Sequence, residues 1–162
     1  MIVMGVDPGV AKLGYAFIEI EGKEGKLKAI DYDCITTSMN LSPGERLKII
    51  NNELNKLIKK YKPNVMAVES VYFFKNLKTA MPVSQAKGVV LLTAAKKKIP
   101  VYEITPLQMK MAITGYGRAE KKQVQEMLRV LLNMKEAPKS DDAADALGVA
   151  FCYVLQDNSR LR

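Results

Sequence analysis

The sequence predicts an α/β fold in which helices flank a five-stranded mixed sheet, made of a three-strand antiparallel meander and two parallel strands. Two observations predict it. Three strand-like runs follow one another at the N-terminus, and the connection between the first two is too short for a crossover helix, so they pair antiparallel. Each of the two later strand-like runs follows a segment of helical periodicity, which is the order typical of right-handed parallel crossovers.

The length and composition are those of one soluble globular domain. The chain has 162 residues, of which 48% are hydrophobic and 26% are charged, and this is enough to bury a sizeable core. We assign residues 1–157 to this domain and residues 158–162 to a frayed C-terminal tail. No apolar stretch is long enough to span a bilayer and the N-terminus lacks a signal-peptide pattern, so we expect a cytoplasmic protein without membrane association.

The net charge and the missing residue types limit the chemistry. A net charge of +8 indicates a polyanionic partner, with nucleic acid favoured over a membrane surface. The chain has no histidine, which excludes histidine-based triads, histidine-ligated zinc and histidine general bases. Cys34 and Cys152 are isolated, which argues against a disulfide framework or a zinc knuckle but leaves a single bridge between them open.

The first strand ends in a candidate functional carboxylate. The apolar run from Ile2 to Val6 is typical of a strand buried on both faces, and Asp7 ends it before Pro8-Gly9 turn the chain. The next two strands, from Tyr15 to Glu21 and from Leu27 to Thr37, flank a glycine-containing hairpin loop. Asp7 is either a turn residue, because aspartate is common in turns, or part of a site at the strand end.

A helix and a fourth strand bring a second carboxylate to the same edge. Ser42-Pro43-Gly44-Glu45 has the pattern of a capping box with proline at the first helical position, and this helix ends near Tyr61. Val65 to Glu69 is another buried-type strand that ends in a carboxylate. A right-handed crossover places this strand beside the first, so Asp7 and Glu69 lie side by side unless Glu69 only faces solvent.

Consecutive aromatic residues follow the fourth strand directly. Tyr72, Phe73 and Phe74 are expected in a loop, and Lys75 comes next. They either pack onto the core or a partner subunit, or form a stacking surface for nucleic acid with lysine for the phosphates. A helix from about Thr79 to Lys98 and a fifth strand from Ile99 to Ile104 complete this part of the fold.

Basic residues gather after the fifth strand. Thr105-Pro106 begins a short helix that carries Lys110, and the segment 115–117 breaks it. The next helix extends from Arg118 to Leu132, and its start is basic, with Arg118, Lys121 and Lys122. Cations are disfavoured near a helix N-terminus, so these residues are either a solvated charged face or a place where a bound phosphate relieves the conflict.

The last helix supplies two more candidate carboxylates. Ser140 is a candidate N-cap, and Asp141 and Asp142 suit the first turn, where negative charge is stabilised by about 0.3–1 kcal/mol. Asp142 and Asp145 are one turn apart on one face, beside an apolar stripe, where like charges repel unless a cation lies between them. Capping therefore explains Asp141 and Asp142 but does not explain Asp145.

Four carboxylates are thus candidate metal ligands and catalytic residues: Asp7, Glu69, Asp142 and Asp145. Oxygen-only ligands suit Mg²⁺ or Mn²⁺ rather than zinc or copper. Two such ions about 3.5–4 Å apart activate water and stabilise the leaving oxygen of a phosphodiester. This chemistry requires no histidine, in agreement with the composition.

These segments resemble the RuvC-type Holliday-junction resolvases, or crossover junction endodeoxyribonucleases, of the ribonuclease-H-like superfamily. Five segments spanning nearly the whole chain carry the resemblance: GVDPGVAKLGYA, AVESVYFFKN, SQAKGV, GRAEKKQVQEML and DDAADALGVA. It implies a ribonuclease-H-like fold and a homodimer that resolves four-way DNA junctions by paired, near-symmetric nicks in homologous recombination and DNA repair. It also implies two Mg²⁺ ions held by the four carboxylates, with Mn²⁺ able to substitute, and the RuvA–RuvB branch-migration complex as a partner.

The resemblance also assigns DNA contacts and leaves two choices open. Lys110 and Lys121 fall on basic positions that the family places against DNA, and Tyr72 falls where relatives carry a stacking phenylalanine. Which aromatic of the segment 72–74 stacks is open, because this segment is more aromatic than the family pattern. Asp141 is an alternative ligand to Asp142, which we favour because the family spacing counts back three residues from Asp145.

Three other functions compete with junction resolution. A related resolvase-like nuclease that processes ribosomal RNA precursors is usually shorter and lacks the AVES and aromatic segment. A catalytically silent junction-binding scaffold requires a missing or misplaced carboxylate, whereas the sequence has all four. An actin-like ATPase needs two such domains, and this chain holds one.

Overall fold

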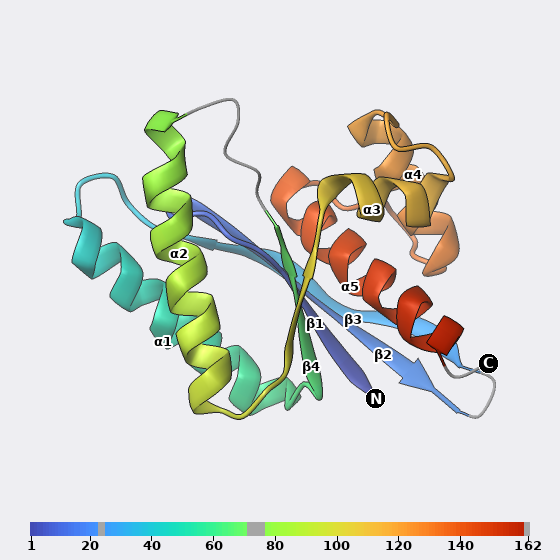
Figure 1. Ribbon diagram of the computed structural model, residues 1–162, viewed down its shortest axis with the longest axis horizontal. Coiled ribbons are helices and arrows are strands. Elements are labelled where there is room, and N and C mark those ends of the chain that lie inside the picture. Colours follow the sequence, from blue (N-terminus) through green and yellow to red (C-terminus); the bar gives the residue numbers. More distant parts are fainter. Residues whose placement is uncertain (23–24, 71–76, 161–162) are drawn as a thin grey trace.

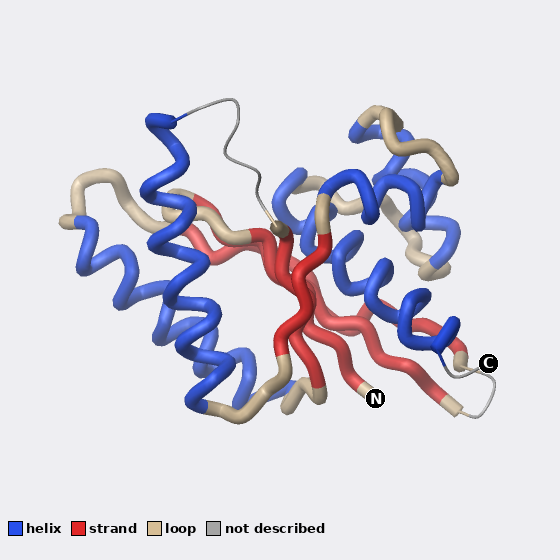
Figure 2. The backbone as a smooth tube through the Cα atoms, viewed as in Figure 1, coloured by secondary structure: helices blue, strands red, loops and turns tan. Residues whose placement is uncertain are grey.

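A five-stranded mixed sheet forms the centre of the protein, with helices on both of its faces (Figure 1, Figure 2). The computed structural model describes residues 1–22, 25–70 and 77–160, without the side chains of 77–79 and 158–160. The strand order is β3-β2-β1-β4-β5. The strands are β1 (Ile2–Asp7), β2 (Lys12–Glu21), β3 (Lys26–Thr36), β4 (Val65–Glu69) and β5 (Val101–Ile104).

The strand pairing confirms the predicted topology. β1 pairs antiparallel with β2, and β2 pairs antiparallel with β3. β1 pairs parallel with β4, and β4 pairs parallel with β5, because helical crossovers connect these strands. The predicted start of the fifth strand at Ile99 is wrong by two residues. The backbone N–H of Ile99 donates to Ala94 O at 3.0 Å, so this residue still belongs to the turn that closes the preceding helix.

Two helices cover one face of the sheet. They are α1 (Pro43–Tyr61) and α2 (Leu77–Lys96), which lie together on the left in Figure 1. The predicted capping box at α1 is confirmed, because Ser42 Oγ accepts from Glu45 N and Ser42 N donates to Glu45 Oε2. The prediction of a helix from Thr79 to Lys98 is shifted, since α2 begins and ends two residues earlier.

Three helices cover the other face: α3 (Pro106–Thr114), α4 (Lys121–Leu131) and α5 (Asp141–Arg160). α4 begins three residues later than predicted, because Glu120 has an extended backbone and is its N-cap. α5 packs across β1 and β2 and buries nearly all of its apolar side chains. It continues to Arg160, so it includes the start of the tail expected at 158–162.

Two glycines allow α5 to lie directly on the sheet. A Cβ atom on Gly5 of β1 would stand 1.9 Å from the carbonyl oxygen of Ala146, and one on Gly14 of β2 would stand 2.0 Å from that of Asp142. Any larger residue would push the helix away from the strands. The first turn of α5 is therefore fixed against β2. Among the residues that the structure describes, no helix is both long and apolar enough to cross a membrane.

Candidate active site

Two carboxylates lie side by side where β1 and β4 end. Asp7 is the last residue of β1 and Glu69 is the last residue of β4. The parallel register pairs Val6 with Val68, so the next residue on each strand emerges at the same edge. The side chains of Asp7 and Glu69 share a hydrogen bond. This arrangement is the one predicted from the crossover, and it contradicts the alternative in which Glu69 only faces solvent.

The first turn of α5 brings the other two carboxylates to this edge. The contact of Gly14 with the Asp142 carbonyl places this turn against β2, next to the end of β1. The half-buried Asp142 is close enough to Asp7 for its charge to raise the pKa of Asp7, and Asp145 acts in the same way on Glu69. Carboxylate side chains from three distant parts of the sequence thus come together at one edge of the sheet.

Burial and mutual repulsion hold protons on this cluster. Burial is the main cause that raises the pKa of Asp7. Burial, with the charge of Asp7, raises the pKa of Glu69 to about 9, and the same two causes raise the pKa of Asp145 to about 6. Desolvated carboxylates at such short range disfavour the charged state unless a cation neutralises them.

The donor set fits a hard divalent cation. The polar atoms that come together here are carboxylate oxygens, which Mg²⁺ and Mn²⁺ prefer. Burial first, and then neighbouring negative charge, raise the pKa values of Asp7, Glu69 and Asp145, and a bound cation would offset both effects. Within residues 1–22, 25–70 and 77–160, no three Asp, Glu or Cys side chains stand close enough to form a ready-made metal site. Asp7 and Glu69 instead satisfy each other by sharing a proton.

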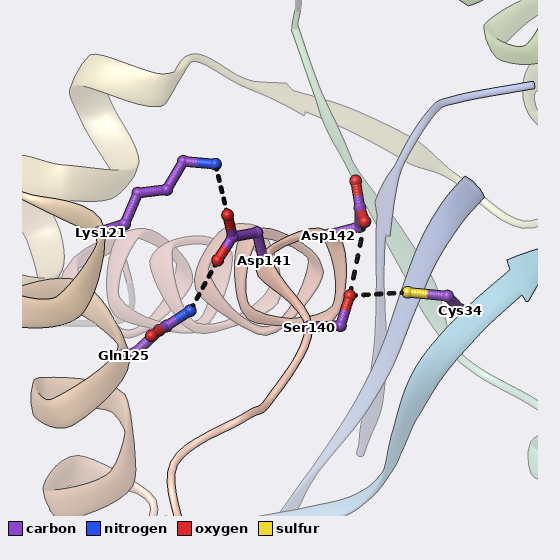
Figure 3. Close-up of polar contacts among 6 residues, drawn as sticks. All are labelled: Cys34, Lys121, Gln125, Ser140, Asp141 and Asp142. Carbon is purple, nitrogen blue, oxygen red and sulfur yellow. Dashed lines mark hydrogen bonds and ion pairs between the residues drawn. The ribbon is translucent and has the colours of Figure 1, made fainter. Parts of the chain in front are cut away.

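Asp141 and Asp142 have different surroundings although they are adjacent. Asp141 Oδ2 accepts from Lys121 Nζ at 2.9 Å and Asp141 Oδ1 accepts from Gln125 Nε2 at 2.9 Å, so this side chain turns toward α4. Figure 3 shows Asp142 on the opposite side of the turn, beside the strands. The hydrogen bond from Lys121 lowers the pKa of the exposed Asp141. The charge of Asp142 acts on Asp7, whereas Asp141 pairs with Lys121 and lines the cavity that Glu69 and Asp145 also line. We propose Asp142 as the metal ligand of the two.

We expect Asp141→Asn to lower junction cleavage less than about 10-fold, because the exposed ion pair with Lys121 contributes only about 0–1 kcal/mol. Asp142→Asn is the matched comparison, one residue away in the same turn, and is expected to lose at least about 100-fold. Single-turnover cleavage of a four-way DNA junction in Mg²⁺ measures both. An equal loss in the two variants would contradict the placement of Asp142 in the cluster.

The structure adds a polar connection that the sequence did not indicate. Ser140 Oγ donates to Asp142 Oδ2 at 3.4 Å and also contacts Cys34 Sγ at 3.0 Å (Figure 3). Ser140 was expected as an N-cap, and its carbonyl does accept the backbone N–H of Ala144 at the start of α5. No spacing pattern links Cys34 on β3 with the start of α5. Cys34 and Cys152 are both free, so the bridge that the sequence left open is absent.

Two of the predicted basic residues lie beside the carboxylates. Lys110 of α3 and Lys121 of α4 line a cavity of about 190 Å³ together with Glu69 and Asp145. The charge of Lys121 acts on Asp7, Glu69 and Asp145 and lowers the pKa of each against the effect of burial. Lys121 also forms the ion pair with Asp141, so a carboxylate of the protein itself offsets the unfavourable position of this cation at the start of α4.

The other residues that were predicted to contact DNA do not line the cavity beside the carboxylates, or lie outside the described residues. Lys122 lines a neighbouring hollow with Tyr116 and Met127, and Arg118 is exposed in the loop before α4. The predicted stacking segment, Tyr72, Phe73, Phe74 and Lys75, lies outside the described residues.

The mixed sheet, with acidic residues at the ends of two parallel strands and at the start of a helix packed across it, defines a protein of the ribonuclease-H-like class. A family model described as "Crossover junction endodeoxyribonuclease RuvC" matches residues 3–153. The chain belongs to the RuvC family.

Relatives and solved structures match nearly the whole chain. A crossover junction endodeoxyribonuclease RuvC from Alkaliphilus metalliredigens is 52% identical over 153 residues, which cover 94% of this chain and 92% of the relative. The structure of Thermus thermophilus RuvC matches with a TM-score of 0.90 at 33% identity, covering 99% of this chain and 97% of that one. The T. thermophilus RuvC structure in complex with a Holliday junction substrate matches with a TM-score of 0.88 at 30% identity, covering 98% and 96%.

Proposed function

We propose that this protein is a structure-selective endonuclease that resolves four-way DNA junctions by paired, near-symmetric nicks in recombination and repair. The observation that carries the proposal is that the charges of Asp7, Glu69, Asp142 and Asp145 act on one another at one edge of the sheet, where Lys110 and Lys121 line a cavity with Glu69 and Asp145. Membership of the RuvC family supports the substrate, since a relative of this fold has been solved with a Holliday junction.

The four carboxylates are proposed to hold two Mg²⁺ ions, with Mn²⁺ able to substitute. Metal ions held there would provide an activated water and would stabilise the leaving oxygen of the phosphodiester. Asp7 and Glu69 fix one side of the site from the rigid strand ends, and Asp142 and Asp145 fix the other from α5. Metal binding at neutral pH requires that the proton on Glu69 leaves, because only the carboxylate form is a ligand and the pKa of Glu69 is raised to about 9.

Lysines beside the carboxylates are proposed to receive the DNA backbone. Lys110 and Lys121 project into the same cavity as Glu69 and Asp145, where an ammonium group would neutralise charge that builds on the phosphate. Arg118 and Lys122 extend the basic surface along the start of α4. The aromatic segment, residues 72–74 with Lys75, is proposed to stack against bases near the junction centre, on the basis of the family resemblance.

A homodimer is proposed because paired nicks need two active sites. α2 has an exposed stripe without charged side chains, formed by three residues that are one or two helical turns apart. Met81 is 70% exposed and Leu92 is 53% exposed, and Gly88 lies between them with open space around it. A stripe of this kind on a long helix suits a second copy of the same helix. A handover of the junction by RuvA–RuvB, and action in the cytoplasm, are parts of the same proposal and rest on the family.

Leu92→Glu is expected to convert the dimer to a monomer, because it replaces one of the two exposed apolar side chains of the stripe by a charged one. Met39→Glu is the matched control, since Met39 is 85% exposed in the loop between β3 and α1 and is not part of the stripe. Light scattering after size-exclusion chromatography measures the mass of each variant. A dimeric Leu92→Glu protein would show that the subunits meet elsewhere.

The function itself is tested with a synthetic four-way junction labelled on each strand in turn. In Mg²⁺ we expect two nicks at symmetric positions on opposing strands, and none in EDTA. A ribosomal RNA precursor incubated under the same conditions tests the processing alternative, and binding without cleavage would favour the silent scaffold. Either of these last two results would overturn the proposal.

A further inference from the structure

Six lysines gather where α1 and α2 end, at the edge of the sheet opposite the carboxylates. α1 and α2 pack together and run in the same direction, and both end where β4 and β5 begin (Figure 1). Asp7 and Glu69 lie at the other ends of the parallel strands. The lysine patch consists of Lys59, Lys60 and Lys62 at the end of α1 and Lys96, Lys97 and Lys98 at the end of α2.

The two halves of the lysine patch face a common hollow. Lys59 and Lys62 from the end of α1 and Lys97 from the end of α2 line a cavity of about 340 Å³, whose remaining lining is apolar. All six lysines of the patch are exposed. The charges of two separate helix ends therefore act on one region of the surface.

The charge of the lysine patch exceeds what the fold itself can use. Each helix C-terminus carries the equivalent of about half a negative charge, so the two ends together offset about one lysine. Asp31 acts on Lys60, which also lies 4.6 Å from the centre of the Tyr61 ring. None of the six lysines forms an ion pair with any residue that the structure describes. About four positive charges remain without compensation.

The backbone at two of these positions makes lysine an unfavourable choice for ending a helix. Lys62 has φ of 48° and Lys98 has φ of 56°, which is the left-handed region. Glycine adopts this conformation freely, whereas a residue with a Cβ atom is disfavoured there by about 1 kcal/mol. Helix termination alone therefore favours glycine at both sites. The lysines add charge to the patch at a small expense in stability.

We propose that the lysine patch is a second DNA-contact surface, which binds the phosphates of duplex DNA without reading its sequence. The inference rests on the proposed function, because that function brings a long duplex to the protein. Lysine ammonium groups suit this role, since they contact phosphates as point charges with little geometric demand. β4 has five residues, so the patch and the carboxylates are about 17 Å apart along the sheet, roughly half a helical turn of DNA. One bound DNA molecule can therefore reach both.

The test removes charge from the patch and compares it with charge removed elsewhere. The patch variant is Lys59→Gln/Lys62→Gln/Lys97→Gln. The control is Lys26→Gln/Lys48→Gln/Lys135→Gln, which removes the same charge from three exposed lysines on separate parts of the surface. Binding to a labelled linear duplex is measured by anisotropy across a series of salt concentrations. A Lys→Arg version of the patch variant keeps the charge and reports whether the backbone there tolerates substitution.

The patch variant is expected to lower the slope of log affinity against log salt concentration by about 0.9 for each phosphate that the protein no longer neutralises, up to about 2.7. The control and the arginine version are expected to keep the wild-type slope. A patch variant that binds with the same slope as the control would overturn the inference, as would a reduced slope that the arginine version shares. If the wild type cleaves four-way junctions while the patch variant binds duplex DNA normally, only this inference fails. If the wild type cleaves no junction in Mg²⁺, the proposed function fails instead.

Discussion

Asp7→Asn is expected to reduce cleavage of a four-way junction by at least about 10³-fold, equivalent to about 4 kcal/mol of transition-state stabilisation. Asp7 is the carboxylate on which the others converge, because it shares a hydrogen bond with Glu69 and its pKa responds to the charge of Asp142. An amide in its place cannot supply the negative oxygen that a divalent ion requires. Single-turnover cleavage in Mg²⁺ at saturating enzyme measures the effect.

The same substitution is expected to leave folding intact and to increase stability without metal. Burial raises the pKa of Asp7, so charging it at neutral pH destabilises the folded state, and the neutral amide removes that penalty. Junction binding should remain within a few-fold of wild type. Glu19→Gln, near the opposite end of β2, is the control that changes one carboxylate outside the site. Wild-type cleavage by the Asp7→Asn protein would remove Asp7 from the catalytic set.

Metal-free protein is expected to lose stability as the pH rises from about 5 to 8, by an amount on the order of a few kcal/mol. The folded state holds the pKa of Glu69 at about 9 and that of Asp145 at about 6, both above the ordinary values of unfolded carboxyls. In this pH range the folded chain binds more protons than the unfolded chain, so raising the pH favours unfolding. Thermal melts in EDTA across this range measure the trend.

Adding Mg²⁺ or Mn²⁺ is expected to reverse this loss, with a larger gain in melting temperature at pH 8 than at pH 5. The ion binds the charged carboxylates, which are the form that higher pH supplies. Glu69→Gln isolates the contribution of the site from that of other titrating groups, because it removes the carboxyl whose pKa is raised to about 9. Its melting temperature should vary less with pH than that of wild type. Equal pH dependence in both proteins would show that Glu69 is not the destabilising group.

The sequence predicted the parts of this fold that depend on local pattern. The capping box at Ser42 is a signal within four residues, and the carboxylates at the ends of β1 and β4 follow apolar runs directly. The antiparallel pairing of the first two strands followed from a short connection, and the parallel crossover followed from a known handedness. Together these were sufficient to place Asp7 beside Glu69.

Contacts between distant segments could not be predicted in this way. The close contact of Gly14 with the Asp142 carbonyl determines where α5 lies. The residue patterns of β2 and α5 do not predict this contact. The hydrogen bonds of Ser140 with Cys34 and Asp142, and the ion pair that turns Asp141 toward Lys121, depend on the same docking. Family spacing favoured Asp142 over Asp141, and the different side-chain contacts of the two residues support that proposal. Helix ends were shifted by two or three residues. The start of α4 is set by Glu120, whose backbone N–H donates to Gln123 Oε1, and the end of α2 is set by the backbone hydrogen bonds of its closing turn.

The acidic cluster has a consequence for the growing polypeptide on the ribosome. Asp7 and Glu69 are translated early, whereas Asp142 and Asp145 come from the final helix. An incomplete translation product therefore contains only half of the acidic groups and lacks the helix that seats them. We therefore expect a polypeptide that stops before α5 to have no nuclease activity, because it lacks Asp142 and Asp145.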